Sequence, residues 1–354
     1  MIEIDGSTGE GGGQVLRTSL ALSILTHQPV RLRAIRAGRS KPGLAAQHLK
    51  SVEAAAAICG GEVEGAALGS THLVFSPGEV NPGRYRFDIG TAGAVTLVLQ
   101  TIFLPLCLAQ AASNVLITGG THVPWSPCYH YLEQQWLPAL QGMGAEARLS
   151  LDQSGFYPQG GGQIQAHIQP VIKLLPLQQV ERGPLLRIRG ISGVANLDAD
   201  IARRQKLQAL RRLEPVCRDT KIEILDLPGR TKGTFILLTA QFEKSQAVYS
   251  ALGEPGKRAE QVADEAVEQL LEFLDSDGAI DQFLADQLLL PLCLASGPSS
   301  IRTLKVTLHL LTNAEIIRAF LPVEIGISGD LGQAANIQII PSVANELPPF
   351  QNNH

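Results

Sequence analysis

The sequence predicts an α+β fold in which three repeated β-α-β-α-β-β units surround a pseudo-threefold axis and a smaller α+β domain is inserted into the third unit. The first indication is the pentapeptide Pro-Leu-Cys-Leu-Ala, which closes an apolar, helix-length stretch at 105–109 and again at 291–295. The second is a glutamate that ends an amphipathic run and begins strand-like alternation, at Glu62, Glu146 and Glu324. Successive glutamates are 84 and 178 residues apart, so the third unit contains about 94 additional residues.

Length and composition agree with this organisation. A chain of 354 residues that is 45% hydrophobic can bury a large core and form about two domains. We expect a repeat-built core at 1–182 and 279–341, an inserted α+β domain at 183–278 and a tail at 342–354. The repeats of the core are expected at about 1–80, at 81–170, and at 171–182 together with 279–341.

Alternation with a period of two predicts the strands of each unit, and apolar periodicity of about 3.6 residues predicts the helices. In the first unit, strands are expected at 2–5, 29–35, 62–64 and 72–75, and helices at 14–26 and 44–59. In the second unit, strands are expected at 85–87, 114–117, 146–151 and 162–168, and helices at 92–109 and 128–143.

The third unit is expected to begin near Leu185 and to resume after the insertion. Its later elements are a helix at 281–295, a strand at 300–308, a helix at 313–320 and strands at 323–327 and 336–340. The insertion is expected to contain strands at 186–188, 221–225 and 233–240 and a basic helix at about 202–213. A helix at 259–274 fits either the insertion or the core.

Cysteine usage and hydropathy indicate a cytoplasmic protein. The chain has five cysteines and no C-x-x-C pair, so we expect reduced thiols and no thiolate metal site. No basic leader precedes the first strand-like residues. Residues 91–112 carry no charge, but they contain Gln100 and Pro105 and lack a flanking Lys or Arg, which favours a buried helix over a membrane span.

The charge distribution is uneven. A net charge of −4 argues against a surface built for nonspecific nucleic-acid binding. The segment 11–52, however, has no acidic residue and seven cations, which are Arg17, Arg31, Arg33, Arg36, Arg39, Lys41 and Lys50. This segment predicts a surface for phosphates. Arg31 and Arg33 alternate on one strand face and fit solvated positions equally well.

Polar loops follow the second strand of each unit. These loops are 36–39, 119–122 and 309–313, and their equivalent positions predict that they converge. A fourth loop, 9–14, has three consecutive glycines before a helix, so it exposes N–H groups that favour an anion. It is neither a G-x-G-x-x-G nor a Walker A sequence, which excludes dinucleotide-binding and P-loop interpretations.

Several motifs together closely resemble those of the RNA 3'-terminal phosphate cyclases, over nearly all of residues 2–340 and least in the insertion. The motifs are Glu10-Gly-Gly-Gly-Gln14, Arg36-Ala-Gly-Arg39, Pro42-Gly43-Leu44, Gln47-His48, Gly155-Phe156-Tyr157-Pro158, Gly160-Gly161-Gly162, Ala285-Asp286-Gln287 and His309-Leu-Leu-Thr-Asn313. The resemblance implies three repeats similar to the C-terminal domain of a translation initiation factor, with a smaller inserted domain. It also implies ATP-dependent conversion of an RNA 3'-phosphate into a 2',3'-cyclic phosphate.

His309 matches the nucleophile of this family, which implies a covalent histidyl-AMP enzyme and an RNA(3')pp(5')A intermediate. Glu10 matches the position that holds a divalent cation, Mg²⁺ or Mn²⁺, on the ATP phosphates. Arg36 and Arg39 suit bidentate phosphate contacts. The adenylate-binding positions of the family fall on Gln100, Phe283, Leu284, Ala285, Asp286 and Gln287, and a tyrosine often replaces Phe283 in relatives.

The resemblance leaves several points open. His122 stands where relatives can carry an acid or an amide, and its role is undetermined. The expected partners are ATP and RNA with a 3'-phosphate end, with no membrane and no obligate protein partner, and the basic helix at 202–213 is expected to extend RNA contact. Two alternatives are a noncatalytic ribosome-assembly scaffold of the same superfamily, which would lack the nucleophilic histidine, and an enolpyruvyl-type transferase, which the single long insertion disfavours.

Overall fold

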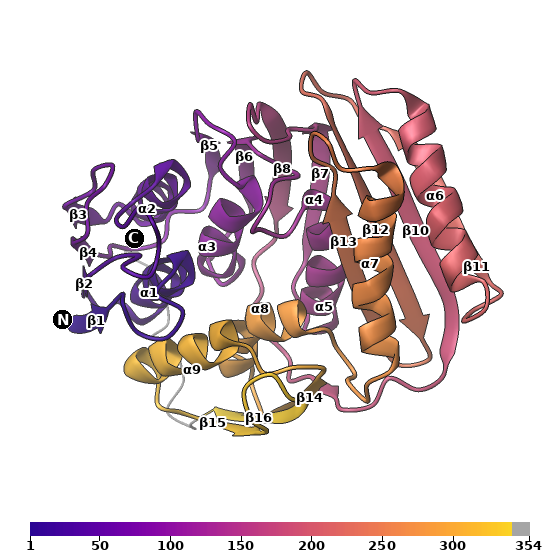
Figure 1. The fold of residues 1–354 in the computed structure, drawn as a ribbon. Coiled ribbons are helices and arrows are strands. Elements are labelled where there is room, and N and C mark those ends of the chain that lie inside the picture. The colour runs from indigo at the N-terminus through magenta and orange to yellow at the C-terminus, as the bar shows by residue number, and fades with distance from the viewer. Residues whose placement is uncertain (342–354) are drawn as a thin grey trace.

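A computed structural model describes residues 1–341 of the chain, and it contains four four-stranded sheets with helices packed between and against them (Figure 1). The prediction of a mixed α+β fold is therefore confirmed. The first sheet has the order β1-β2-β4-β3, with β1 parallel to β2 and the other pairs antiparallel. Its unit consists of β1 (Ile2–Asp5), α1 (Gly13–Thr26), β2 (Val30–Arg33), α2 (Ala46–Cys59), β3 (Glu62–Glu64) and β4 (Leu73–Ser76).

The second sheet, β5-β6-β8-β7, has the same order and the same parallel first pair. Its elements are β5 (Arg84–Asp88), α3 (Val95–Cys107), β6 (Ser113–Gly119), α4 (Tyr129–Tyr131), η1 (Leu132–Trp136), α5 (Leu137–Gly142), β7 (Ala147–Gln153) and β8 (Gly162–Ile168). The predicted helix at 128–143 is continuous but includes a π-helical turn, η1.

The third sheet reads β9-β14-β16-β15, again with a parallel first pair. It is formed by β9 (Gln178–Gln179), β14 (Ser299–Thr303), β15 (Val323–Ser328) and β16 (Ala335–Pro341), together with α8 (Gln282–Cys293) and α9 (Leu308–Phe320). The start of this unit near Leu185 was predicted wrongly. Leu185 begins a strand of the fourth sheet, and the strand that pairs with β14 is two residues long, too short to show periodicity.

A second difference concerns the residues before His309. The strand predicted at 300–308 ends at Thr303, and the helix predicted from 313 begins at Leu308. Leu304, Val306 and Leu308 continue the alternation of a strand, which explains the error. The helix begins earlier because Thr307 caps it, accepting a hydrogen bond from the N–H of Leu310 at 2.9 Å.

The fourth sheet, β11-β10-β12-β13, has a hydrophobic cluster with α6 and α7 that is separate from the main core. Its elements are β10 (Leu185–Ala195), α6 (Ala199–Leu213), β11 (Thr220–Asp226), β12 (Gly233–Phe242), β13 (Gln246–Leu252) and α7 (Ala259–Leu274). The buried residues of α7, among them Val262 and Phe273, belong to this cluster, so the helix at 259–274 packs with these strands. Figure 1 shows α6 and α7 side by side on this sheet.

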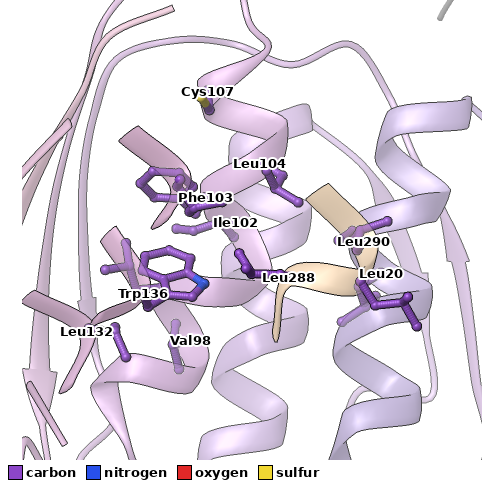
Figure 2. Close-up of a cluster of buried hydrophobic side chains, with 14 of the residues drawn as sticks. Leu20, Val98, Ile102, Phe103, Leu104, Cys107, Leu132, Trp136, Leu288 and Leu290 are labelled. Atoms are coloured by element: carbon purple, nitrogen blue, oxygen red, sulfur yellow. The ribbon is translucent and has the colours of Figure 1, made fainter. Parts of the chain in front are cut away.

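The main core is formed where helices of different units meet. Leu20 of α1, Ile102 of α3 and Leu288 of α8 are fully buried in one cluster, and Figure 2 shows them together with Trp136. The ring of Phe103 packs edge-on against Trp136, with centroids 4.8 Å apart. The uncharged stretch at 91–112 thus forms a core helix. Within residues 1–341, no helix combines the length and apolarity needed to span a membrane.

Candidate active site

His309 lies in the first turn of α9, where the N-terminal ends of two helices meet. Its helix packs against α1, and Thr18 Oγ1 of α1 donates a hydrogen bond to Asn313 Oδ1 of α9 at 2.7 Å. The first turns of both helices have N–H groups without intrahelical partners, and the helix dipoles make this region favourable for an anion. His309 is therefore in a helix rather than in the loop that the sequence predicted.

The glycine-rich loop 9–14 before α1 packs directly against α9. Gly9 has a φ of +61°, and a Cβ at this position would overlap Thr312 Oγ1. Thr312 Oγ1 accepts a hydrogen bond from the N–H of Glu10 at 3.1 Å. Gly9 thus allows a close approach that fixes Glu10 beside the N-terminus of α9.

The imidazole of His309 contacts Gln14 and Glu10. Nδ1 lies 2.6 Å from Oε1 of Gln14 and 3.1 Å from Oε2 of Glu10. Because a carboxamide oxygen only accepts, Nδ1 carries the proton and Nε2 keeps its lone pair. Burial lowers the pKa of His309 from its usual 6.5, and the positive charges of Arg17 and Arg39 lower it further. The residue is therefore a neutral imidazole with Nε2 available for attack on phosphorus.

The guanidinium groups of Arg17 and Arg39 lie near this imidazole, and Arg36 lies in the same loop as Arg39. Arg39 forms an ion pair with Glu10, whose side chain is only 11% exposed. Arg36 Nη1 donates to the carbonyl of Gly43 at 2.7 Å. Burial lowers the pKa of Arg17 to about 10, so this side chain remains a cation. The structure therefore gathers cations from α1 and from the loop after β2 around His309.

Three further residues of this site were named in the sequence, Arg17 among the predicted phosphate-binding cations and Gln14 and His48 within motifs, but they were not assigned roles beside His309. Gln14 and Arg17 lie on the first two turns of α1, and His48 lies on α2 beside Gly13, where a Cβ would overlap its ring. Burial lowers the pKa of His48 to about 3, with contributions from Arg17, Arg36 and Arg39, so His48 is neutral. The i, i+3, i+4 spacing of Gln14, Arg17 and Thr18, which places them on one face of a helix, was the available signal for Gln14 and Arg17.

The prediction that all seven cations of segment 11–52 form a surface for phosphates is wrong in part. Acidic residues outside the segment form ion pairs with several of these cations. Arg31 and Arg33 both pair with Glu3 on the neighbouring strand, at 2.9 and 3.3 Å. Lys50 pairs with Glu53 one helical turn later. The basic helix at 202–213 is neutralised in part, since Arg204 and Arg212 form ion pairs with acidic residues of α7.

Of the expected adenylate-binding residues, Gln100 lies on α3 and the others lie on α8. The residues on α8 are divided between an exposed side and a buried side of that helix. Gln100 Nε2 donates to Gln287 Oε1 at 2.6 Å, and Gln287 Nε2 donates to the carbonyl of Phe283 at 2.9 Å. Phe283 is 43% exposed, whereas Leu284 and Ala285 are buried in the core. The accessible part of this set is therefore Phe283, Gln287 and the amide of Gln100.

Asp286 connects α8 to the nucleophile helix. Its Oδ1 accepts from Thr307 Oγ1 at 2.7 Å, and its carbonyl accepts from Asn313 Nδ2 at 3.0 Å. Burial raises the pKa of Asp286 to about 8, so the carboxyl is largely protonated at neutral pH. Because Thr307 caps α9, Asp286 holds the turn that carries His309.

His122 lies in a buried aromatic cluster of the second unit. Its Nε2 is 2.9 Å from His130 Nδ1, and its ring stacks on Phe156 with centroids 5.0 Å apart. Burial and His130 lower its pKa well below 6.5, so it is neutral. The packing of His122 on rings is that of a structural residue.

Within the described chain, no group of three or more His, Cys, Asp or Glu side chains is arranged to hold a metal ion. Glu10 is a single buried carboxylate at the anion-binding end of α1. Mg²⁺ commonly takes one or two protein carboxylates and completes its octahedron with phosphate oxygens and water. The donor set therefore fits a cation that arrives with a phosphorylated substrate.

The fold and this site define a class of α+β protein in which a neutral histidine lies near guanidinium groups at two helix N-termini. A family model described as RNA 3'-terminal phosphate cyclase matches residues 8–327. The chain belongs to the RNA 3'-terminal phosphate cyclase family.

Curated relatives agree with this assignment. The chain is 46% identical over 327 residues to "RNA 3'-terminal phosphate cyclase" of Gloeothece citriformis, covering 90% of this chain and 93% of that protein. The protein of the same name in Archaeoglobus fulgidus is 46% identical over 322 residues, covering 91% and 96%. A solved enolpyruvyl transferase, NikO from Streptomyces tendae, aligns with 96% of this chain and 81% of its own, at 12% identity and a TM-score of 0.26, which carries no argument about fold or activity.

Proposed function

We propose that the chain converts an RNA 3'-terminal phosphate into a 2',3'-cyclic phosphate with ATP, through a histidyl-AMP on His309 and an RNA(3')pp(5')A intermediate. The observation that carries the proposal is the hydrogen bond from His309 Nδ1 to Gln14 Oε1, which leaves Nε2 unprotonated beside Arg17 and Arg39.

In the first step, Nε2 of His309 attacks the α-phosphorus of ATP. A P–N bond forms, the bond between the α-phosphorus and the bridging oxygen breaks, and pyrophosphate leaves. Nδ1–H remains bonded to Gln14, and the nearby carboxylate of Glu10 stabilises the positive charge that the ring acquires. Arg17 and Arg39 offset the negative charge on the phosphoryl oxygens.

In the second step, an oxygen of the RNA 3'-phosphate attacks the AMP phosphorus, the P–N bond breaks, and neutral His309 is restored. In the third step, the 2'-hydroxyl attacks the 3'-phosphorus and loses its proton to solvent, the bond from that phosphorus to the bridging oxygen breaks, and AMP leaves as the cyclic phosphodiester forms. Arg36 and Arg39 suit phosphate recognition because each guanidinium presents a planar fork of donors.

Glu10 is the residue that would hold Mg²⁺ or Mn²⁺ on the ATP phosphates. When bound there, the cation would neutralise phosphate charge. The chain's own contribution is a buried carboxylate fixed by its backbone bond to Thr312. Without a cation between them, this carboxylate would repel a triphosphate at the same helix terminus.

For the adenosine, we propose contact with the exposed ring of Phe283 and with the linked amides of Gln100 and Gln287. Leu284 and Ala285 would support this surface from the core, and Asp286 would hold α9 in place. Phe283 supplies a ring face but lacks the hydroxyl that a tyrosine would offer.

We further propose that the three sheets of equal strand order are repeats about a pseudo-threefold axis, with residues 183–278 as the inserted domain. The shared order, the parallel first pair and the separate hydrophobic cluster of the fourth sheet support this. All five cysteines are free thiols, which supports a cytoplasmic location. ATP and RNA are the proposed partners, and no obligate protein partner is required by the site.

The decisive experiment is incubation of the protein with α-labelled ATP, followed by denaturing electrophoresis. Label on the chain that is lost in acid and retained in alkali is expected, because a phosphoramidate is acid-labile. His309→Ala should abolish the label, whereas exposed His72→Ala should retain it. Equal labelling of His309→Ala would disprove the assignment.

A further inference from the structure

Two large aromatic side chains on neighbouring loops of the second unit are exposed to solvent. Trp125 is 100% exposed and Tyr157 is 69% exposed. Their loops are joined by the bridge between His122 and Phe156 and by a hydrogen bond from the N–H of His122 to the carbonyl of Gly155 at 3.1 Å. Because His122 and Phe156 are buried, the loops are anchored while Trp125 and Tyr157 face outward.

The backbone at Trp125 supports a function for this exposure. Its φ is +64°, a left-handed conformation that is unfavourable for a bulky side chain. Because the ring of Trp125 is fully exposed, no packing of the side chain compensates for this backbone strain. Such outliers persist where a binding role maintains them.

A third loop, 227–233, brings positive charge to the same place. The N–H of Ser154 donates to the carbonyl of Pro228 at 2.6 Å, and the N–H of Phe156 donates to Thr231 Oγ1 at 2.9 Å. Arg230 and Lys232 of this loop are exposed, and neither has an ion pair within residues 1–341. Two free cations therefore lie on the loop that is docked beside the aromatic residues.

A chain of contacts links the loop of Tyr157 to the His309 site. Gly160, in the loop of Tyr157, approaches the segment before α3 so closely that a Cβ would lie 2.7 Å from Ala92 Cα. Two residues further, the N–H of Ala94 donates to Gln47 Oε1 at 2.9 Å. Gln47 precedes His48, whose ring lies against Gly13 at the start of α1.

The loops along this path carry no acidic residue. They are 36–48, 89–94, 119–128, 154–162 and 227–233. Their cations are Arg36, Arg39, Lys41, Arg230 and Lys232. Exposed Asp88 and Asp226 lie at the edges of two of these loops. The cations and the two exposed rings of the loops themselves match a polyanion that also presents flat apolar faces.

We propose that Trp125 and Tyr157 stack on unpaired bases of the RNA upstream of its 3'-phosphate, while Arg230 and Lys232 contact the backbone. This inference rests on the proposed function, because it assumes that the 3' end lies at His309. Single-stranded RNA fits better than a duplex, because splayed bases offer faces to aromatic side chains whereas paired bases are stacked on each other. Stacking accepts any base, so this surface would hold RNA ends without strong sequence preference.

The test uses the fluorescence of the full chain, which has two tryptophans. Trp136 is 3% exposed in the core and serves as the internal reference, whereas Trp125 reports on the surface. Titration with a single-stranded 3'-phosphorylated oligonucleotide RNA, without ATP, should quench the solvent-exposed component. Trp125→Ala and Tyr157→Ala should each weaken RNA binding about tenfold, and Trp125→Phe should restore most of it.

Matched controls separate this surface from the His309 chemistry. Ile172→Ala removes another fully exposed apolar side chain and should leave RNA binding unchanged. Transfer of AMP from ATP to the chain without RNA should be the same in all these variants. Salt dependence is the slope of the logarithm of the RNA-binding constant against the logarithm of the salt concentration. Arg230→Ala and Lys232→Ala should each make this slope shallower by about 0.7.

Unchanged RNA affinity in both Trp125→Ala and Tyr157→Ala would overturn the proposal. It would also be overturned if Trp125 emission changed with protein concentration alone and Trp125→Ala abolished a dimer, because the surface would then bind a second copy of the chain. Absence of AMP transfer in the unmodified chain, with RNA quenching intact, would refute the proposed function and leave RNA stacking on this surface supported.

Discussion

His309 and Gln14 are joined across the junction of α9 and α1, with Nδ1 of the imidazole 2.6 Å from Oε1 of the amide. The two residues are 295 positions apart in the sequence. The contact fixes the orientation of the ring and the nitrogen that carries the proton. Gln14 is thus a positioning residue for the proposed nucleophile.

Gln14→Ala should slow AMP transfer to the chain by about tenfold to a hundredfold, because the ring loses the acceptor that selects its tautomer. Gln14→Glu should instead raise the pKa of His309 through its negative charge. The acidic limb of the pH–rate profile for AMP transfer should then move to higher pH. Identical profiles for Gln14→Glu and the unmodified chain would show that Gln14 does not act through the imidazole.

The lowered pKa of His309 predicts that AMP transfer falls only below pH 6.5, where the imidazole becomes protonated. Arg17→Met removes one of the positive charges that lower this pKa, while the effect of burial remains. The midpoint of the acidic limb should therefore rise. Arg33→Met, which changes an exposed residue paired with Glu3, should leave the midpoint unchanged. The midpoint is the readout, because Arg17→Met is also expected to reduce the rate itself.

Glu10 and Arg39 should respond differently to added metal. Glu10→Gln weakens the site for Mg²⁺ or Mn²⁺, so a raised metal concentration should recover part of the rate of AMP transfer. Arg39→Ala removes a guanidinium fork that a cation does not replace, and its defect should be insensitive to metal. Equal rescue of both variants, or of neither, would contradict this division of roles.

Asp286→Asn should change how stability depends on pH. The pKa of the folded-state carboxyl is raised from 3.8 to about 8, so its contribution is fully favourable below pH 3.8 and is lost as the pH rises towards 8. Asn keeps the oxygen that accepts from Thr307 and does not titrate. From pH 5 to pH 8, the free energy of unfolding of the unmodified chain should fall relative to that of Asp286→Asn by about 1 to 3 kcal/mol.

Urea unfolding at several pH values measures this difference. Asp226→Asn, at an exposed position of β11, should follow the pH dependence of the unmodified chain. If Asp286→Asn also follows it, the buried carboxyl is not protonated in the folded state.

Regular periodicity made most of the elements predictable. Strand β1 and strand β8 were predicted with the bounds they have, and α1 and α2 were predicted within two residues at each end. Errors occurred where the local pattern was ambiguous. The strand β9 has only two residues and therefore shows no periodicity. The alternation of Leu304 and Val306 is typical of a strand, but Thr307 caps the start of a helix directly after them.

The sequence by itself determined the mixed α+β class, the family motifs and the residue types from which a phosphate-binding site could be built. It also predicted that His309 and Arg39 follow the second strands of different units and that Glu10 lies in a separate glycine-rich loop, because repeated units have repeated spacing. Only the tertiary structure decided which side chains meet. The pairing of His309 with Gln14, the neutralisation of Arg31 by Glu3 and the protonation of Asp286 depend on distance and burial. These quantities arise when distant segments pack together, and no local pattern encodes them.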